Sequence, residues 1–343
     1  MNLKDLTDEQ VFIVAEISAN HNHDYDLTIE TINAIADSGA NAVKIQTLKP
    51  ELLSLDINNQ FFGPKKDGLW KGFRPFELYQ KSMMPWEWQP KLKAYAESLG
   101  LLCFSTPFDK TAVDFLEEMD VPVYKIASFE IHDIPLIEYI ASKQKPVIIS
   151  TGIATLADIE EAVNACRRMG NNEIALLKCT SAYPAPIEEA NLRTIPHLRD
   201  TFGVVSGLSD HTLGSSVAIA SVALGAKIIE KHFILDRNMG GPDAAFSMEP
   251  AEFKQMVKSV REVEQALGKI NYQLSEKVEK NRKFARSLFI VKDMKKGEVF
   301  TEENVRSIRP GYGLHPKYLN DVLGKKIRKN TEKGTPLDWN IIN

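Results

Sequence analysis

Residues 207–233 read GLSDHTLGSSVAIASVALGAKIIEKHF and contain a strand–helix–strand pattern. The apolar runs VVSGLSD (204–210) and KIIEKHF (227–233) are short and bounded by polar or turn residues, which predicts two buried strands. The small-residue segment between them, SSVAIASVALGA, predicts a helix that ends near Gly225. His211 directly follows the first predicted strand, and His232 lies at the end of the second.

The same alternation covers most of the chain. Six further apolar runs precede this pair, at 11–18, 41–47, 101–107, 123–128, 146–151 and 174–181. Amphipathic segments of helical pattern separate them. Eight buried strands alternating with helices are typical of an α/β (β/α)₈ TIM barrel. An open doubly wound sheet is the alternative, but no G-x-G-x-x-G follows the first run and the count of eight favours closure.

Two segments depart from the repeat. Leu48–Met84 is a long connection without helical periodicity, which is typical of a lid or binding loop, although a plain surface excursion is the alternative. The five aromatic residues between Phe61 and Phe76 would be costly to expose. Beyond the barrel pattern of 1–268, the charged stretch 269–285 predicts a linker. Residues 286–343 predict a small β-rich domain that docks on a barrel, either its own or a partner's.

Composition narrows the class of protein. The chain of 343 residues has a formal net charge of −4 with both signs interspersed, whereas a nucleic-acid-binding protein would carry a basic face. No apolar run approaches the length of about 18 residues that a membrane-spanning helix needs, and the N-terminus does not resemble a signal peptide. The cysteines are odd in number and lack C-x-x-C spacing. We therefore expect a cytoplasmic protein that binds neither nucleic acid nor membrane.

Polar residues collect where the predicted strands end, which is where TIM-barrel active sites lie. His211 and His232 follow or end adjacent strands, so their imidazoles can converge on one metal ion. Two unrelated loop histidines are the alternative. Two imidazoles without a firm third protein ligand indicate an open site for Mn²⁺ or Mg²⁺, because a structural zinc site needs four protein ligands.

Lysines and hydroxyl groups form a second set at these strand ends. They predict a site for a phosphate and a carboxylate, although a strand-end lysine can also be merely solvated. The set comprises Lys44, Lys125 and Lys178, together with Thr106, Ser128, Ser150 and Ser209. Glu16 ends the first strand and is either a general acid or base or the structural partner of a lysine. Asp243 is either a second carboxylate of the site or a turn residue.

Ten short motifs, in order along the chain, resemble the sialic acid synthase family. They are AEISANHN, VKIQT, FSTPFD, YKIAS, STG, CTSAYP, GLSDHT, VALGAKIIEKHF, GGPD and IRPGYG…VLGKKI. In that family, phosphoenolpyruvate is condensed with an amino-sugar aldehyde to give a nonulosonic acid and phosphate. The C-terminal domain resembles the antifreeze-like (SAF) domain, which in this family covers the partner subunit's barrel in a domain-swapped homodimer.

The resemblance also implies roles for individual residues. It makes His211 and His232 the metal ligands and Glu16 and Asp243 the candidates for proton transfer. The implied phosphoenolpyruvate site consists of Lys44, Thr106, Lys125, Ser128, Ser150 and Ser209. The implied sugar site consists of Gln46, Phe108 and Tyr183, with Arg309 from the SAF domain and Phe284 from the preceding linker.

Within the family, SANH and GLWKGFRPFELYQKSMMPWEW resemble the branch that uses 2,4-diacetamido-2,4,6-trideoxy-L-altrose. Branches that use N-acetylmannosamine or a legionaminic-type sugar are the nearest alternatives. A metal-independent aldolase with a Schiff base on Lys125 or Lys178, and a condensation onto a sugar phosphate, are more distant ones. A non-catalytic sugar- or ice-binding protein is the alternative from a different class.

Overall fold

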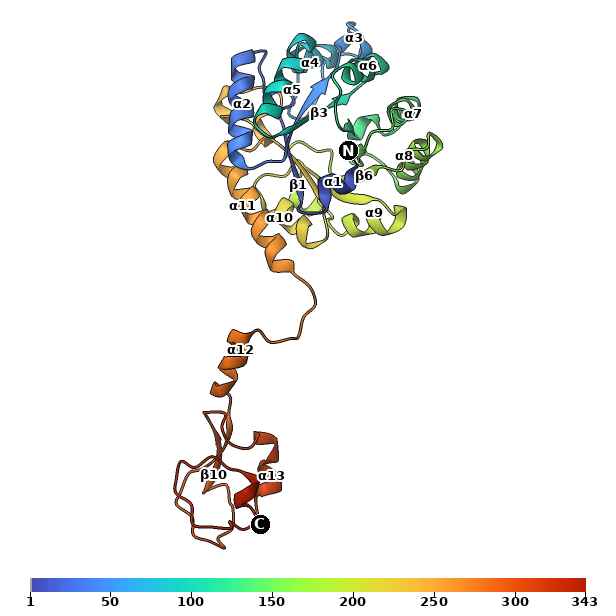
Figure 1. The fold of residues 1–343 in the computed structure, drawn as a ribbon. Coiled ribbons are helices and arrows are strands. Elements are labelled where there is room, and N and C mark those ends of the chain that lie inside the picture. The colour runs from blue at the N-terminus through green and yellow to red at the C-terminus, as the bar shows by residue number, and fades with distance from the viewer. Residues whose placement is uncertain (1) are drawn as a thin grey trace. The chain divides into compact units, whose positions relative to one another are not determined.

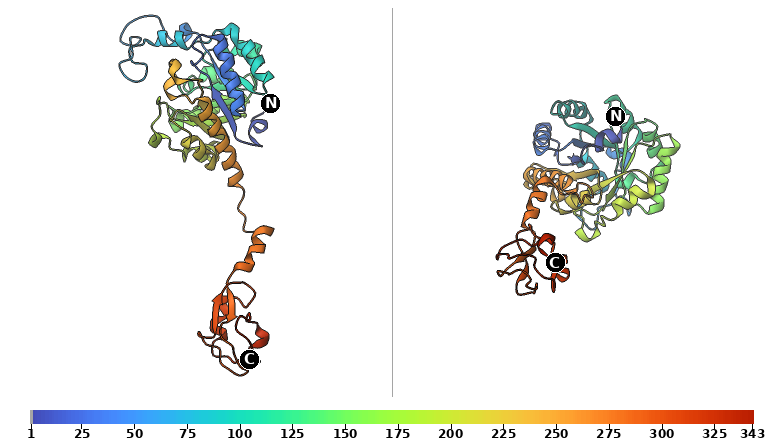
Figure 2. Two further views of the ribbon diagram at one scale, coloured as in Figure 1. Left: turned by 90° about the vertical axis from the view of Figure 1, so that its left-hand side faces the viewer. Right: turned by 60° about the horizontal axis from the view of Figure 1, so that its bottom comes forward.

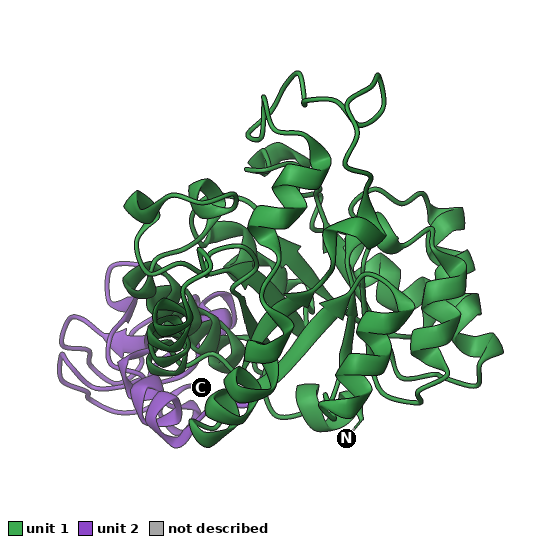
Figure 3. Ribbon diagram, turned by 90° about the horizontal axis from the view of Figure 1, so that it is seen from above, with its two compact units in different colours: residues 1–268 green, residues 269–343 purple. Residues whose placement is uncertain are grey.

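The computed structural model describes residues 2–343, which form two compact units that divide after Gly268 (Figure 3). The first unit is a closed barrel in which eight parallel strands pair in chain order (Figure 1). These strands are β1 (Phe12–Glu16), β2 (Ala42–Thr47), β3 (Leu102–Pro107), β4 (Tyr124–Ile126), β5 (Val147–Ser150), β6 (Ile174–Cys179), β7 (Val205–Asp210) and β8 (Ile228–His232). The predicted TIM barrel is therefore confirmed.

A ring of helices surrounds the strands (Figures 1 and 2). One helix follows each strand: α2 (Tyr25–Ser38), α5 (Gln89–Ser98), α6 (Lys110–Glu118), α7 (Ile134–Ala141), α8 (Leu156–Arg168), α9 (Thr194–Phe202), α10 (Ser216–Ala223) and α11 (Pro250–Leu267). The short helix α1 (Leu3–Thr7) precedes the barrel. Helix α2 shows the local signals: Asp24 accepts a hydrogen bond from the Leu27 N–H at its start, and Gly39 ends it at φ +83°. Within the described residues, no helix has both the length and the apolar character needed to cross a bilayer.

Alternation along the strands separates the barrel interior from the layer beneath the helices. One buried cluster fills the interior and includes Val14, Ala42, Phe104 and Ile148, while the outward residues of the same strands pack under the helices. The next inward-facing residue lies two positions further along each strand: Glu16 after Val14, and Ser150 after Ile148. The inward face thus changes from apolar to polar toward the carboxyl ends of the strands.

The long connection between β2 and α5 contains two short helices, α3 (Pro50–Leu53) and α4 (Pro75–Ser82), so it is more ordered than its lack of periodicity predicts. Between them it projects from the barrel as an open loop (Figure 2, left). The expectation that its aromatic residues are buried is only partly right, because the Phe61 side chain is 75% exposed. We call residues 48–84 the insert.

The second unit has its own small core around Leu288, Phe300 and Ile327. It contains helices α12 (Glu276–Asn281) and α13 (Leu319–Val322) and an antiparallel pair of strands, β9 (Ser287–Ile290) and β10 (Val305–Ile308). Helix α12 falls inside the stretch predicted as a linker. The two units differ in charge: residues 269–343 carry 17 Lys and Arg against 9 Asp and Glu, a net +8, and residues 1–268 carry 25 against 37, a net −12.

Candidate active site

A cavity opens at the carboxyl ends of the strands. Eleven of the residues that the sequence singled out line it: Lys44, Gln46, Phe108, Lys125, Ser128, Ser150, Tyr183, Ser209, His211, His232 and Asp243. Glu16 and Thr106 lie just beneath, and both contact Lys44. Phe284 and Arg309 belong to the second unit, so their contribution to this site stays a prediction.

Strand register explains why these side chains meet. Glu16 is paired with Lys44 on β2 and with His232 on β8, so all three stand at one level of the barrel. Ser209 on β7 is paired in the same way with Glu230 on β8. Neighbouring strands lie about 4.8 Å apart, so residues at one level whose side chains face inward must be close in space.

Two carboxylates and two lysines form a buried ion cluster at this level. Lys44 Nζ forms an ion pair with Glu16, lies 3.6 Å from Glu230 Oε1 and donates a hydrogen bond to Thr106 Oγ1 at 3.2 Å. Lys125 Nζ lies 3.9 Å from the same Glu230 oxygen. The positive charges are thus held at the cavity floor, where an anionic ligand would meet them largely without competing solvent.

The pKa values of the two carboxylates, Glu16 and Glu230, are shifted in opposite directions. Burial raises the pKa of Glu16 from 4.5 to about 7, although Lys44 opposes the shift. Burial acts on Glu230 too, but Lys125 and Lys44 outweigh it and hold its pKa below the usual value. Glu16 can therefore gain or lose a proton near neutral pH, while Glu230 stays ionised as the counter-charge of the lysines. Such a divergence is the pattern expected of an acid–base residue beside a charge-stabilising one.

Hydroxyl and amide donors extend the positive floor. Lys125 Nζ donates to Ser150 Oγ at 2.6 Å, and the Gly152 N–H donates to Ser128 Oγ at 3.0 Å. A Cβ on Gly152 would lie 2.8 Å from Ser128 Oγ and 2.1 Å from Ser181 Oγ, so only glycine allows the loop after β5 to approach so closely. Lysines, hydroxyls and a close backbone are a donor set that suits a phosphate or a carboxylate.

His211 and His232 do converge, because their ring centroids lie 5.3 Å apart. His211 Nδ1 lies 3.0 Å from the Thr180 carbonyl oxygen. A carbonyl only accepts, so Nδ1 carries a hydrogen and Nε2 is the nitrogen left to face a ligand. Burial, followed by the charge of His211, holds the pKa of His232 well below its usual value, so this imidazole is neutral. Among residues 2–343, nothing hydrogen-bonds the buried Nδ1 of His232.

These two rings fit the ligand set of a divalent cation. His232 can offer a neutral imidazole nitrogen. Burial opposes protonation of His211, but Cys179 outweighs it and raises the pKa of this ring, so a cation would bind in place of the Nε2 proton, and the Thr180 carbonyl orients the ring. Within the described part of the chain, no group of three or more His, Cys, Asp or Glu side chains is arranged to hold a metal. Any cation bound between the rings would therefore keep positions open for water and substrate.

Asp243 closes the site from the loop after β8. Its Oδ2 accepts hydrogen bonds from Ser18 Oγ at 2.5 Å and from the Ala19 N–H at 3.3 Å, and lies 4.0 Å from His232 Nδ1. Gln46 Nε2 donates to the same Ser18 hydroxyl at 2.9 Å. Burial raises the pKa of Asp243, which Ser18 partly counters. Asp243 is thus a held member of the cavity wall rather than a free turn residue.

The structure adds residues to which the sequence analysis assigned no role. Glu230 was visible only as one acid in KIIEKHF, and its alternation with His232 was the available signal. Glu130 also lines the cavity, and burial raises its pKa to about 7. Trp70 of the insert also lines the cavity. Lys178, in contrast, lies on the outward phase of β6 and donates to the Cys179 carbonyl at 2.7 Å, so it does not join the site.

Comparison with known proteins now bears on the identity of this fold and cavity. Residues 31–272 match the NeuB family, and residues 285–342 match the SAF domain. The chain is 48% identical to the pseudaminic acid synthase of Helicobacter pylori, over 95% of this chain and 96% of that protein. It is 38% identical to the N,N′-diacetyllegionaminic acid synthase of Campylobacter jejuni, over 94% and 97%. A solved structure of N-acetylneuraminic acid synthetase from Leptospira borgpetersenii, in complex with citrate, matches with a TM-score of 0.71 and 32% identity, over 80% of this chain and 90% of that one.

The TIM barrel, its polar mouth and the appended SAF domain therefore have a common explanation: the chain belongs to the NeuB family. The resemblance noted from the ten motifs is confirmed, and the proteins named above are synthases of nonulosonic acids. Of those three, the one most similar in sequence to this chain is a pseudaminic acid synthase.

Proposed function

We propose that this protein is a pseudaminic acid synthase, which condenses phosphoenolpyruvate with 2,4-diacetamido-2,4,6-trideoxy-L-altrose and releases phosphate. The choice of sugar rests on the greater identity to the pseudaminic than to the legionaminic acid synthase. The choice of chemistry rests on one feature of the cavity: two converging imidazoles stand over a buried floor of two lysines. N-acetylneuraminic and legionaminic acid synthesis are the alternatives within the family.

Phosphoenolpyruvate would bind on the lysine floor. Its phosphate and carboxylate carry the charges that Lys44 and Lys125 neutralise, and Ser128, Ser150 and Ser209 supply hydroxyl donors. Thr106 holds the Lys44 ammonium group from below at 3.2 Å. Because these side chains come from strands of a closed barrel, the substrate would be fixed on a rigid surface with its C3 methylene facing the histidines.

The sugar would bind above, as its open-chain aldehyde. His211 and His232 would hold a divalent cation, Mn²⁺ or Mg²⁺, which when bound supplies Lewis-acid polarisation of the aldehyde oxygen. Gln46, Phe108 and Tyr183 line the cavity around that position. Asp243, held by Ser18, is placed to accept a hydrogen bond from a sugar hydroxyl.

Glu16 would move the proton of the attacking water. Carbon C3 of phosphoenolpyruvate attacks the aldehyde carbon, and the former aldehyde oxygen takes up a proton to become a hydroxyl group. Water then adds to C2 and gives one proton to Glu16, which passes it to the former aldehyde oxygen. The tetrahedral intermediate then breaks its C2–O bond to phosphate and becomes the ketone, as the remaining hydroxyl proton leaves with the phosphate. A carboxylate whose pKa lies near 7 is suited to this exchange, since it is ionised in part at neutral pH. Asp243 is the alternative proton acceptor.

Phosphoenolpyruvate labelled with ¹⁸O at its bridging oxygen tests this route. We expect all of the label to leave in inorganic phosphate, because the C–O bond breaks, and mass spectrometry of both products measures it. Label found in the sugar acid would contradict the mechanism. Parallel assays with the altrose sugar, its legionaminic-type epimer and N-acetylmannosamine test the substrate, and a clear preference for N-acetylmannosamine would contradict the sugar assignment but not the chemistry.

The SAF domain would complete the site of a partner subunit in a homodimer. The opposite net charges of the two units, +8 and −12, favour docking of one on the other, in the same chain or between chains. Arg309 would then reach an acetamido group of the sugar, and Phe284 would pack nearby. A swapped arrangement further requires that each active site is built from two chains.

Subunit complementation tests the swap. His211→Ala and Arg309→Ala are each expected to be impaired, for different reasons, and a mixture of the two allowed to exchange subunits should regain activity. Half of the dimers formed at random are mixed and each holds one intact site, so roughly a quarter of wild-type activity is expected. No recovery, with mixed dimers demonstrated by native mass spectrometry, would instead show that the SAF domain serves its own barrel.

A further inference from the structure

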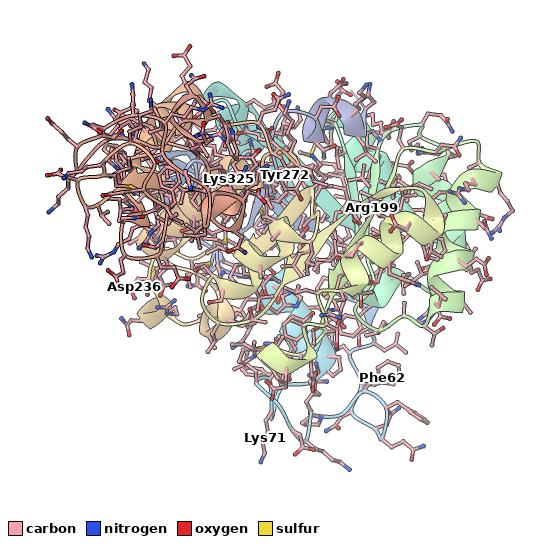
Figure 4. All side chains as sticks on the ribbon, turned by 90° about the horizontal axis from the view of Figure 1, so that it is seen from below. Phe62, Lys71, Arg199, Asp236, Tyr272 and Lys325 are labelled. Carbon is pink, nitrogen blue, oxygen red and sulfur yellow. The ribbon has the colours of Figure 1, made fainter. Side chains whose placement is uncertain are left out.

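Three loops meet at the rim of the cavity and are tied to each other. The insert is held to the loop after β1, because His21 Nε2 lies 3.2 Å from the Ser82 carbonyl oxygen and His23 Nε2 lies 3.1 Å from that of Gln80. The loop after β1 holds the loop after β8 through Ser18 and Asp243. Figure 4 shows Phe62 and Lys71 on the projecting part of the insert.

Trp70 makes the third tie. Its indole Nε1–H donates a hydrogen bond of 2.8 Å to the carbonyl oxygen of Pro242, the residue directly before Asp243. This contact joins residues 172 positions apart and connects the insert to the loop that carries the carboxylate. Asp243 is therefore positioned from two sides, by Ser18 at its side chain and by Trp70 at its backbone.

The Trp70 ring also continues a row of aromatic side chains that starts at the histidines. Tyr183 lies 4.5 Å from His211, ring centroid to centroid, and Trp70 lies 5.3 Å from Tyr183. The Lys65 ammonium group lies 4.6 Å from the centroid of the Trp70 ring. The indole is thus within about 10 Å of the His211 ring, a distance that an extended six-carbon sugar with a substituent at C4 spans when its C1 is at the histidines.

A second cavity also borders the indole. It is lined by Asn22, His23, Leu69, Trp70, Phe73, Leu78, Lys81, Gly241 and Pro242. Trp70 and Leu78 are the two residues that line both this cavity and the one at the barrel mouth. The indole is therefore part of the wall between the cavity at the barrel mouth, where the sugar would lie, and this second cavity.

We propose that Trp70 is a positioning and specificity-determining residue: its N–H fixes the Pro242–Asp243 backbone, and its ring limits the size of the acyl group on the sugar's C4 nitrogen. The inference rests on the proposed function, because it needs an acetamido sugar in the cavity. The two parts can be separated, since phenylalanine keeps an aromatic ring but cannot donate the hydrogen bond, whereas alanine removes both.

Trp70→Phe and Trp70→Ala are tested with the altrose sugar and with analogues that carry propanoyl or butanoyl in place of acetyl at N4. Losing one neutral hydrogen bond is worth about fivefold to tenfold, so Trp70→Phe should lower kcat or raise KM for the sugar by that factor while KM for phosphoenolpyruvate stays unchanged. Trp70→Ala should in addition merge the two cavities. We expect its ratio of kcat/KM for the butanoyl over the acetyl sugar to exceed that of the wild type at least tenfold, by about the contribution of two methylenes.

Trp86→Phe is the matched control. Trp86 follows the same insert, its indole donates to the Leu48 carbonyl at 3.1 Å and its ring stacks on Phe115, so the variant loses an equivalent hydrogen bond away from Asp243. It should keep both the sugar KM and the acyl preference. The inference is overturned if the Trp70 variants behave like Trp86→Phe while the wild type is active. A wild type that condenses none of the three candidate sugars would instead overturn the proposed function.

Discussion

Replacing His211 or His232 with alanine is expected to lower kcat/KM by about a thousandfold or more. Each imidazole would supply one of only two protein ligands to the cation, so loss of either releases it and with it several kcal/mol of transition-state stabilisation. Steady-state assays with both substrates measure the effect, and isothermal titration with Mn²⁺ measures the lost binding independently of turnover. Burial of both rings means that each variant should also be checked for folding by thermal unfolding.

His197→Ala is the matched control for these two variants. His197 lies on the exposed face of α9, away from the cavity, so its replacement should change neither Mn²⁺ binding nor kcat/KM. Chelator treatment of the wild type should abolish activity, and added Mn²⁺ or Mg²⁺ should restore it. Full activity in the presence of EDTA, together with borohydride trapping of pyruvate on Lys125, would contradict the metal-assisted route and favour a Schiff-base aldolase.

Replacing Glu16 with glutamine is expected to lower kcat by about a hundredfold to ten-thousandfold, the usual contribution of a general acid or base. In the wild type, kcat should rise as the pH increases through about 7, because the pKa of Glu16 is raised to that value and the ionised form accepts the proton. Glu16→Gln should remove this rise. An unchanged pH profile in the variant would move the proton-transfer role to Asp243, which is tested in the same way by Asp243→Asn.

The same pKa shift predicts a stability difference of definite sign. The folded protein holds the Glu16 proton more tightly than the unfolded chain does, with a pKa of about 7 against 4.5. The stability that protonated Glu16 contributes is therefore full below pH 4.5 and is lost as the pH rises through about 7. Glutamine cannot ionise, so the free energy of unfolding of Glu16→Gln should decline less over this range. Chemical denaturation at several pH values measures it and also shows that the variant folds.

Much of the site could be predicted because inward-facing and outward-facing side chains alternate along a strand, and this alternation can be counted in the sequence. Lys125 and Ser150 sit two positions beyond interior apolar residues, so a correct strand assignment places them inside the barrel mouth. The same count excludes Lys178 from the site, because it is one position away from the inward-facing residues of its strand. Its ammonium group donates a hydrogen bond to the Cys179 carbonyl instead. The count also separates the inward Glu230 from Lys231, which is out of phase and forms a buried ion pair with Asp210 at 2.8 Å.

The amino-acid sequence was enough to determine the barrel and the end of it that carries the site. Both follow from local periodicity: eight apolar runs, the turn residues that bound them and the polar residues at their ends. Tertiary structure alone decided which carboxylate can hold a proton: Glu16 and Glu230 are chemically alike, and only burial and the distances to Lys44 and Lys125 distinguish them. It alone decided the tie between Trp70 and Pro242 as well, since a contact across 172 residues depends on where the closed barrel brings two loops together and not on any pattern near either residue.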